Sequence, residues 1–150
     1  MKPIATNTID ELEEGLEAKI ERLLTIEDIQ NFANLTQDFH PLHTSVLYAK
    51  ANGFEDVIAH GLLLSSFSST IIGMKLPGEN AIIISQMFTY KKPVYPGTKL
   101  LIKGVIEKID TRFSLLEIKI IITSIDNSQV FATGKYSVKV RENLTKFNNF

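Results

Sequence analysis

The sequence predicts an α+β domain in which a curved antiparallel β-sheet wraps around one central hydrophobic helix. Residues 61–75 are apolar on nearly every side of a helical projection, so a helix there belongs inside the protein. Strand-like segments joined by short turns follow from residue 81 to residue 141, which is typical of an antiparallel sheet. Alternation of apolar and polar residues gives this sheet one dry face, and the apolar helix is the natural partner for it.

Composition restricts the class of protein. A chain of 150 residues suffices for one domain with a sizeable core, and 44% hydrophobic with 22% charged residues is typical of a soluble globular protein. The net charge of −1 argues against nucleic acid or an anionic membrane as the main partner. The chain has no cysteine, which excludes disulfides, thiolate nucleophiles and Cys-ligated zinc, and fits a reducing compartment.

The ends of the chain carry little pattern. Residues 1–12 lack the apolar segment of a secretory signal, and no run approaches the roughly 18 apolar residues of a membrane span. We therefore expect a cytoplasmic protein without a membrane partner. We expect the domain to cover residues 13–142, with terminal extensions at residues 1–12 and 143–150.

The first half of the chain predicts one strand and two short helices. Residues 15–24 read as a strand, and Thr25 with Asp28 forms a helix-capping pattern. That helix must end before Pro41. Ser45 and Gly53 are expected to cap and close a second short helix over residues 45–52. The expected apolar stripe of the first helix consists of Ile26, Ile29, Phe32, Ala33 and Leu35.

The second half predicts four strands, over residues 81–90, 100–109, 114–125 and 129–141. In the third of these, every second residue is a large aliphatic one. The inward-facing residues expected for the last two strands are Leu116, Ile118, Ile120, Ile122, Val130, Ala132, Gly134, Tyr136, Val138 and Val140.

The candidate functional residues lie between residues 38 and 61, where all three histidines fall. Asp38 precedes His43 by five residues, and Pro41 is expected to hold the intervening backbone extended so that the two side chains converge. Gly61 opens the apolar helix, where free N–H groups favour developing negative charge. An acid/base pair beside such a donor indicates chemistry on a carbonyl compound. His60 is interpreted as a loop residue that packs.

Several motifs in order resemble one known family. Asp38-x-x-Pro41-Leu42-His43, Ala49, His60-Gly61-Leu62-Leu63, Leu76-Pro77-Gly78 and Lys92-Pro93-Val94-Tyr95-x-Gly97 together resemble the MaoC-like, (R)-specific enoyl-CoA hydratases. These hydratase-2 enzymes have the hot-dog fold, and the match runs with gaps from about residue 15 to residue 140. The resemblance implies an (R)-specific hydration of trans-2-enoyl-CoA to (R)-3-hydroxyacyl-CoA, and the reverse dehydration.

The resemblance also assigns residues. It implies that Asp38 and His43 are the catalytic pair and that the Gly61 N–H binds the thioester oxygen. The substrate-binding residues it implies are His40, Ser69, Ile72, Pro77 and Gly78, with Ser69 in the acyl pocket and Ile72 limiting acyl length. No metal and no cofactor is expected, because the substrate carries its own CoA or acyl carrier protein. Two subunits are expected to pair their sheets as a homodimer, or a higher oligomer, with the acyl tunnel between them.

Two departures from the family pattern stand in this chain. The family usually has asparagine where His40 stands, and a small pair such as Ser-Gly where Thr36-Gln37 precede the aspartate. A charged imidazole at position 40 would alter the pH profile.

Three other functions compete with this one. A hot-dog thioesterase would generally carry its carboxylate on the central helix, and residues 61–75 contain no acid. A non-catalytic thioester-binding or dimerising module would fit the substitution at His40. A metal site built from Asp38, His40 and His43 is disfavoured by the spacing and by Pro41. Lys91 and Lys92 are interpreted as a solvated pair, with CoA phosphates as the alternative partner.

Overall fold

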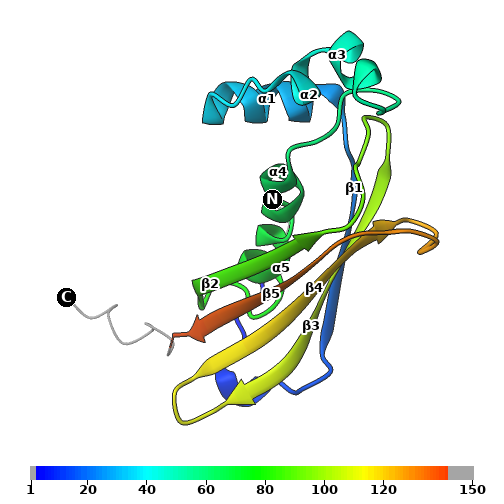
Figure 1. Ribbon diagram of the computed structural model, residues 1–150. Coiled ribbons are helices and arrows are strands. Elements are labelled where there is room, and N and C mark those ends of the chain that lie inside the picture. The colour runs from blue at the N-terminus through cyan, green and yellow to red at the C-terminus, as the bar shows by residue number, and fades with distance from the viewer. Residues whose placement is uncertain (1–2, 142–150) are drawn as a thin grey trace.

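The fold is built on one antiparallel sheet. The computed structural model describes residues 3–141. The strands are β1 (Glu17–Leu23), β2 (Ala81–Tyr90), β3 (Lys99–Asp110), β4 (Leu115–Ser124) and β5 (Val130–Val140). Their order in the sheet is β1-β3-β4-β5-β2, so β1 and β2 form the two edges. All the expected strands are present, and the α+β prediction is confirmed (Figure 1).

The sheet has one dry face, as the alternation of residues predicts. Leu116, Ile118, Ile120 and Ile122 of β4 are all fully buried. The expectation for Val130 was wrong, because this residue opens β5 beside the turn and is 36% exposed. Ala132, Tyr136 and Val138 of β5 are buried opposite Ile122, Ile118 and Leu116 of β4, on the same side of the sheet. Phe131 is also buried, beside an irregularity in the pairing of the two strands.

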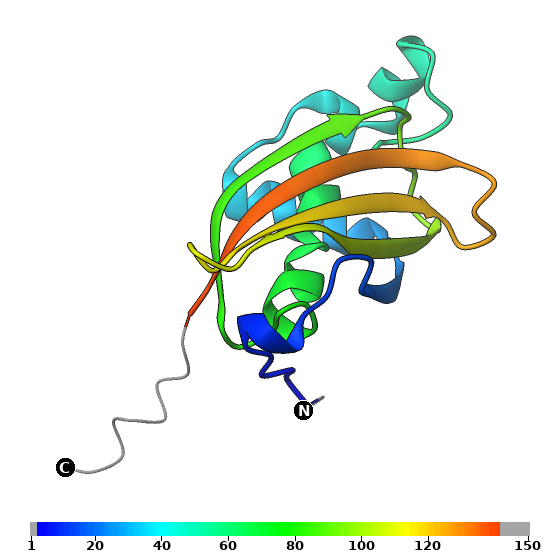
Figure 2. The same ribbon diagram turned by 90° about the horizontal axis from the view of Figure 1, so that it is seen from below.

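The sheet curves around the apolar helix, which Figure 2 shows from below. The helix consists of two pieces, α4 (Gly61–Ser66) and α5 (Ser69–Met74), and not of one uninterrupted helix as the pattern suggests. Between them the chain tightens into i→i+3 hydrogen bonds, such as that from Ser68 N–H to the Ser65 carbonyl. The hydroxyls of Ser65, Ser66 and Ser68 each donate to a carbonyl three residues earlier, which competes with regular helix bonding.

The helix approaches the sheet closely at one glycine. A Cβ placed on Gly104 of β3 would collide with the Ile71 side chain of α5. Glycine at this position lets Ile71 reach the sheet, and Ile71 is fully buried there. The core therefore lies between the dry face of the sheet and the helix pair α4–α5.

Three short helices cover one end of the central helix. They are α1 (Ile26–Thr36), α2 (Pro41–Thr44) and α3 (Val46–Ala51), and Figure 1 shows them together beyond the start of α4. The cap of α1 is the predicted one, with the Thr25 and Asp28 side chains each accepting from the other's N–H. The predicted stripe fails at its two ends, where Ile26 is 36% exposed and Leu35 is 82% exposed.

Helix α2 was not predicted from the sequence, which was interpreted as extended around Pro41. Pro41 does not hold an extended backbone but occupies the first position of a helical turn, where its missing N–H costs nothing. Helix α3 begins and ends as expected, with the Ser45 side chain accepting from the Tyr48 N–H and Gly53 in a left-handed conformation.

The residues before β1 pack onto the far end of the central helix. A 3₁₀ turn, η1 (Ile9–Glu11), precedes β1, and Thr6 forms an isolated bridge with Gly78. The expected boundary at residue 13 stays a prediction, and the extension at 143–150 lies outside the described residues. Within residues 3–141, no helix has the length and apolar character needed to cross a membrane.

Candidate active site

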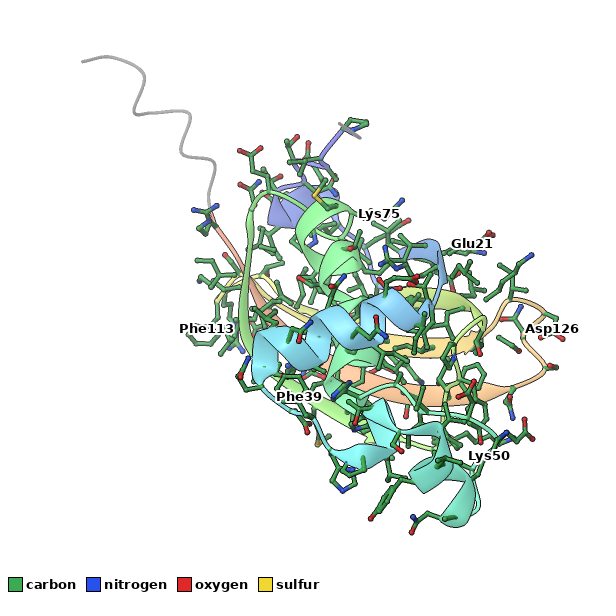
Figure 3. The ribbon with its side chains drawn as sticks, turned by 90° about the horizontal axis from the view of Figure 1, so that it is seen from above. Glu21, Phe39, Lys50, Lys75, Phe113 and Asp126 are labelled. Atoms are coloured by element: carbon green, nitrogen blue, oxygen red, sulfur yellow. The ribbon has the colours of Figure 1, made fainter. Side chains whose placement is uncertain are left out.

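The turn that carries Asp38 and His43 is held by its own side chains. Asp38 Oδ1 accepts from the His40 N–H at 3.2 Å, and His40 Nδ1 accepts from the Leu42 N–H at 3.3 Å. His40 thereby acts as the N-cap of α2. An asparagine oxygen can accept the same bond, so this contact provides a physical account of how histidine serves at a position where asparagine is usual. Figure 3 shows this region from above, with Phe39 labelled on the segment between α1 and α2.

His43 is fixed in one tautomer by the loop that precedes α4. Its Nδ1 lies 2.7 Å from the Ile58 carbonyl oxygen, which can only accept, so Nδ1 carries the proton. The other ring nitrogen, Nε2, keeps its lone pair. Burial lowers the pKa of His43 below its ordinary value of 6.5, and the nearby His60 and His40 act in the same direction. The Ile58 carbonyl and the Asp38 carboxylate oppose this lowering but do not reverse it.

Asp38 and His43 converge as the sequence predicts. A carboxylate oxygen of Asp38 and ring nitrogens of His43 and His60 all lie within 4.8 Å of one another. Two hydrogen bonds of about 2.8 Å span up to roughly 5.6 Å, so a separation within 4.8 Å is short enough for one water molecule to bridge the carboxylate and the imidazole. The Asp38 side chain is 53% exposed, which leaves it open to solvent and substrate.

His60 belongs to the same cluster, which sequence reasoning did not predict. The residue is only 3% exposed, in agreement with its interpretation as a packing residue. Its ring stacks on His43 with centroids 3.7 Å apart and planes at 26°. Its Nε2 lies 3.0 Å from the Asp38 carbonyl oxygen, to which it donates. The one sequence signal was its position directly before Gly61.

The cluster is poorly shaped for a metal ion. The three groups that converge are Asp38, His43 and His60. The metal site considered from the sequence used His40 in place of His60. Imidazole lone pairs lie in the ring plane, and two rings stacked at 26° direct those lone pairs along nearly parallel lines. They do not meet at the short distance that a bound metal requires. The absence of a metal and of a cofactor stays a prediction.

Gly61 lies at the wall of a cavity beside this cluster. The cavity has a volume of about 340 Å³ and is lined by Phe54, Ala59, Gly61, Leu64, Tyr90, Lys91, Lys92, Pro93 and Val94. A Cβ at Gly61 would lie 2.9 Å from the Tyr90 ring, so only glycine fits without a displacement. The Tyr90 hydroxyl donates to Ser65 Oγ at 3.2 Å, which holds the ring in place.

His43 lines a neighbouring cavity of about 390 Å³, together with residues of α1, α3 and the loop before α4. His60 stacks on His43, and the next residue, Gly61, faces Tyr90 in the first cavity. His60 thus links Asp38 and His43, both of which it contacts, to Gly61, which follows it in the chain.

The remaining predicted residues lie farther along the central helix. Ser69 is exposed at the start of α5, and Ile72 is 1% exposed in the core. Pro77 and Gly78 are buried in the loop after α5, against the residues that precede η1. The helix pair between Gly61 and this loop is about 20 Å long. The roles of these four residues in substrate binding stay predictions.

Comparison with known proteins identifies the class to which this fold and site belong. The MaoC like domain family matches residues 7–127, and the chain is a member of that family. Two solved structures share the hot-dog arrangement. The unliganded R-hydratase of Pseudomonas aeruginosa has a TM-score of 0.85 at 25% identity, covering 93% of this chain and 89% of that chain. The (R)-hydratase of Aeromonas caviae has a TM-score of 0.82 at 28% identity, covering 87% and 98%.

Among curated relatives, the chain is similar to two proteins with the same name. It is 36% identical over 89 residues to the (R)-specific enoyl-CoA hydratase of Aeromonas caviae, covering 59% of this chain and 66% of the relative. It is 36% identical over 88 residues to the (R)-specific enoyl-CoA hydratase of Rhodospirillum rubrum, covering 59% and 61%. The chain thus spans just under two thirds of the length of these relatives.

Proposed function

We propose that the protein catalyses the reversible (R)-specific hydration of trans-2-enoyl thioesters, with acyl-CoA as the substrate class. The observation that carries this proposal is the convergence of Asp38 and His43, within 4.8 Å of one another, which is close enough for one water molecule to bridge them. The names of the relatives support the same class of reaction, since they are hydratases that act on enoyl-CoA.

In this mechanism Asp38 and His43 together hold the attacking water. His43 offers Nε2 as an acceptor because Nδ1 is bound to the Ile58 carbonyl. Asp38 takes the larger share in removing the water proton as the oxygen bonds to C3 of the enoyl group. His43 orients the water through the lone pair of Nε2. The proton that Asp38 removes from the water passes to this nitrogen and from there to C2, so that the elements of one water molecule add across the double bond on one face.

Gly61 supplies the stabilisation of charge. As the new C–O bond forms, electron density moves to the thioester oxygen, and the Gly61 N–H at the start of α4 donates to it. Losing a donor of this kind typically costs about 2.7–4 kcal/mol of transition-state stabilisation. The absence of a side chain at Gly61 leaves the cavity beside Tyr90 open for the approaching thioester.

The carrier of the acyl chain is either CoA or acyl carrier protein. Lys91 and Lys92 line the same cavity as Gly61, so a carrier phosphate bound there would meet two cations. The place of Lys91 and Lys92 in this cavity favours binding of CoA phosphates over an interpretation of the two lysines as a solvated pair.

A homodimer joined along β2 is part of the proposal. β2 is an edge strand of ten residues, and Ile82, Ile83, Ile84 and Met87 on it are all exposed. A long apolar edge of this kind is a template for pairing with another strand. A second copy of the same edge would cover these residues and extend the sheet across two subunits.

The thioesterase alternative has less support. The central helix residues 61–75 carry no carboxylate, and Asp38 projects from the turn before α2 instead. The non-catalytic alternative rested on His40, and the cap that His40 provides weakens it.

The deciding experiment follows the loss of enoyl-thioester absorbance with crotonyl-CoA and an octenoyl-CoA analogue, and resolves the configuration of the product. Formation of the (R)-3-hydroxyacyl thioester is the expected result. Release of free CoA without hydration would support the thioesterase, and saturable binding without turnover would support the non-catalytic module.

A further inference from the structure

We propose that His60 is a positioning residue that fixes Asp38 and His43 relative to each other through one contact to each. This inference rests on the proposed hydration at Asp38 and His43, and it assigns a task to a histidine that the mechanism above leaves unused.

The first contact is to His43. The two rings stack at a centroid distance of 3.7 Å, while the Ile58 carbonyl holds the edge of the His43 ring. A ring fixed on one face and at one edge cannot rotate away from the water it must orient. The ring of Phe32, from α1, packs on the His60 ring, with centroids 5.0 Å apart.

The second contact is to Asp38. His60 Nε2 donates to the Asp38 backbone carbonyl at 3.0 Å, and the Asp38 carboxylate lies 3.9 Å from the same nitrogen. The other hydrogen bonds of Asp38 are local ones, from its N–H to Thr36 Oγ1 at 3.4 Å and from the His40 N–H to its Oδ1 at 3.2 Å, so the bond from His60 is the one that ties this turn to the start of α4. His60 is anchored at the entry to α4, where its carbonyl accepts from the Leu64 N–H.

The remaining nitrogen of His60 argues against a purely structural role. Nδ1 is buried and has no hydrogen-bond partner among residues 3–141. A buried polar atom without a partner is unfavourable, and a phenylalanine would fill the same space without that loss. A histidine at this position is therefore explained by the bond from Nε2 to Asp38, together with the stack on His43.

Three variants separate the two contacts. His60→Phe keeps a ring over His43 and loses the bond to Asp38, His60→Gln keeps a donor and loses the stack, and His60→Ala loses both. A shift of about 1 Å in a catalytic group can cost about 100-fold in rate. We expect kcat on crotonyl-CoA to fall by about that factor in His60→Ala and by less in the other two, with KM nearly unchanged.

A second readout follows His43 directly. The titratable groups around it are His60, Asp38 and His40. His60→Gln removes a ring that shields His43 and a neighbour that can carry positive charge. The midpoint of the His43 ring resonance in an NMR titration should therefore move to higher pH. Phe32→Leu serves as the matched control, because it loosens the same buried cluster without removing either His60 contact. It should lower thermal stability while keeping kcat within about twofold of the parent.

The outcomes are distinct from those that test the hydratase itself. Unchanged kcat and an unchanged His43 titration in His60→Gln would overturn the positioning role. A loss of kcat in Phe32→Leu as large as that in His60→Ala would also overturn it, by showing that general loosening suffices. If the parent protein hydrates neither crotonyl-CoA nor the octenoyl analogue, the proposed function fails, and the His43 titration alone then decides the positioning role.

Discussion

Replacing Gly61 by alanine tests the cavity and the site together. The added Cβ would lie 2.9 Å from two carbons of the Tyr90 ring, whereas carbon atoms in good contact are about 3.5–4.0 Å apart. The ring must therefore retreat by about 0.6 Å or more. Its hydroxyl bond to Ser65 Oγ is already 3.2 Å long, so this retreat breaks the bond.

The expected cost follows from these distances. Losing the Tyr90 hydroxyl bond costs about 0.5–1.5 kcal/mol of unfolding free energy. Gly73→Ala is the matched control, because Gly73 also lies in the central helix and a Cβ there meets nothing within 4 Å. That control should gain about 0.5–1 kcal/mol, since alanine is the better helix former. The two variants should therefore differ by roughly 1–2.5 kcal/mol in thermal or denaturant unfolding.

The effect on activity should exceed the effect on stability. The methyl group of Gly61→Ala narrows the approach of the thioester to the N–H, and a misplacement of about 1 Å costs about 100-fold in kcat/KM. Adding Tyr90→Leu to Gly61→Ala should relieve the clash and recover part of the stability without restoring kcat/KM. A Gly61→Ala protein as stable as Gly73→Ala, with parental kcat/KM, would refute the reasoning.

Five further predictions concern the turn that carries Asp38 and His43, the pKa of His43, and the edge strand β2. Asp38→Ala and His43→Ala should each lower hydration by about 10²–10⁴-fold, measured with crotonyl-CoA, while circular dichroism stays that of the parent. The acid limb of the pH profile of kcat/KM should have its midpoint below pH 6.5. The lowered pKa keeps the His43 ring neutral, and able to accept a proton, until the pH falls below that value. His43 binds a proton more readily in the unfolded chain than in the folded protein, because its pKa is lowered only in the folded protein. The free energy of unfolding should therefore also fall as the pH drops below 6.5. His40→Ala should lower kcat/KM by removing the cap of α2, worth about 1 kcal/mol, whereas His40→Asn should retain it. Ile84→Lys should shift sedimentation toward the monomer, because it places a charge on the apolar edge.

Each of these has a result that contradicts it. Near-parental turnover in Asp38→Ala or His43→Ala would remove that residue from the mechanism. An acid limb above pH 6.5 would mean that another group, or a charged His43, governs the reaction. Equal kcat/KM in the two His40 variants would show that the cap does not matter. A dimer that persists unchanged in Ile84→Lys would place the subunit contact elsewhere.

Features set by neighbouring residues could be predicted from the sequence. The cap formed by Thr25 and Asp28 needs only a spacing of three, and it is present. The buried face of β4 follows from alternation alone. The errors lie at the ends of elements, where Leu35 and Val130 keep the pattern but the chain no longer faces the core. Pro41 was misjudged because proline suits both an extended segment and the first turn of a helix.

Long-range features of the site could not be predicted in the same way. The convergence of Asp38 and His43 follows from five residues of local spacing together with a family resemblance. The stack of His60 on His43 joins residues 17 positions apart, and the end of α2, helix α3 and a loop lie between them. No periodic pattern in the sequence predicts such a contact. The tight fit of Tyr90 against Gly61 likewise depends on how β2 passes the helix.

The division of the central helix has a consequence for the order of folding. Helices α4 and α5 have six residues each, and isolated helices shorter than about 12–15 residues are marginal in water. Neither piece holds its shape until the sheet covers it. The β3–β4 and β4–β5 hairpins join neighbours in the chain through short turns, so their contacts close cheaply and early. We expect these hairpins to form first, with Gly61 and His60 reaching their working positions only when the helix pair settles onto the finished sheet.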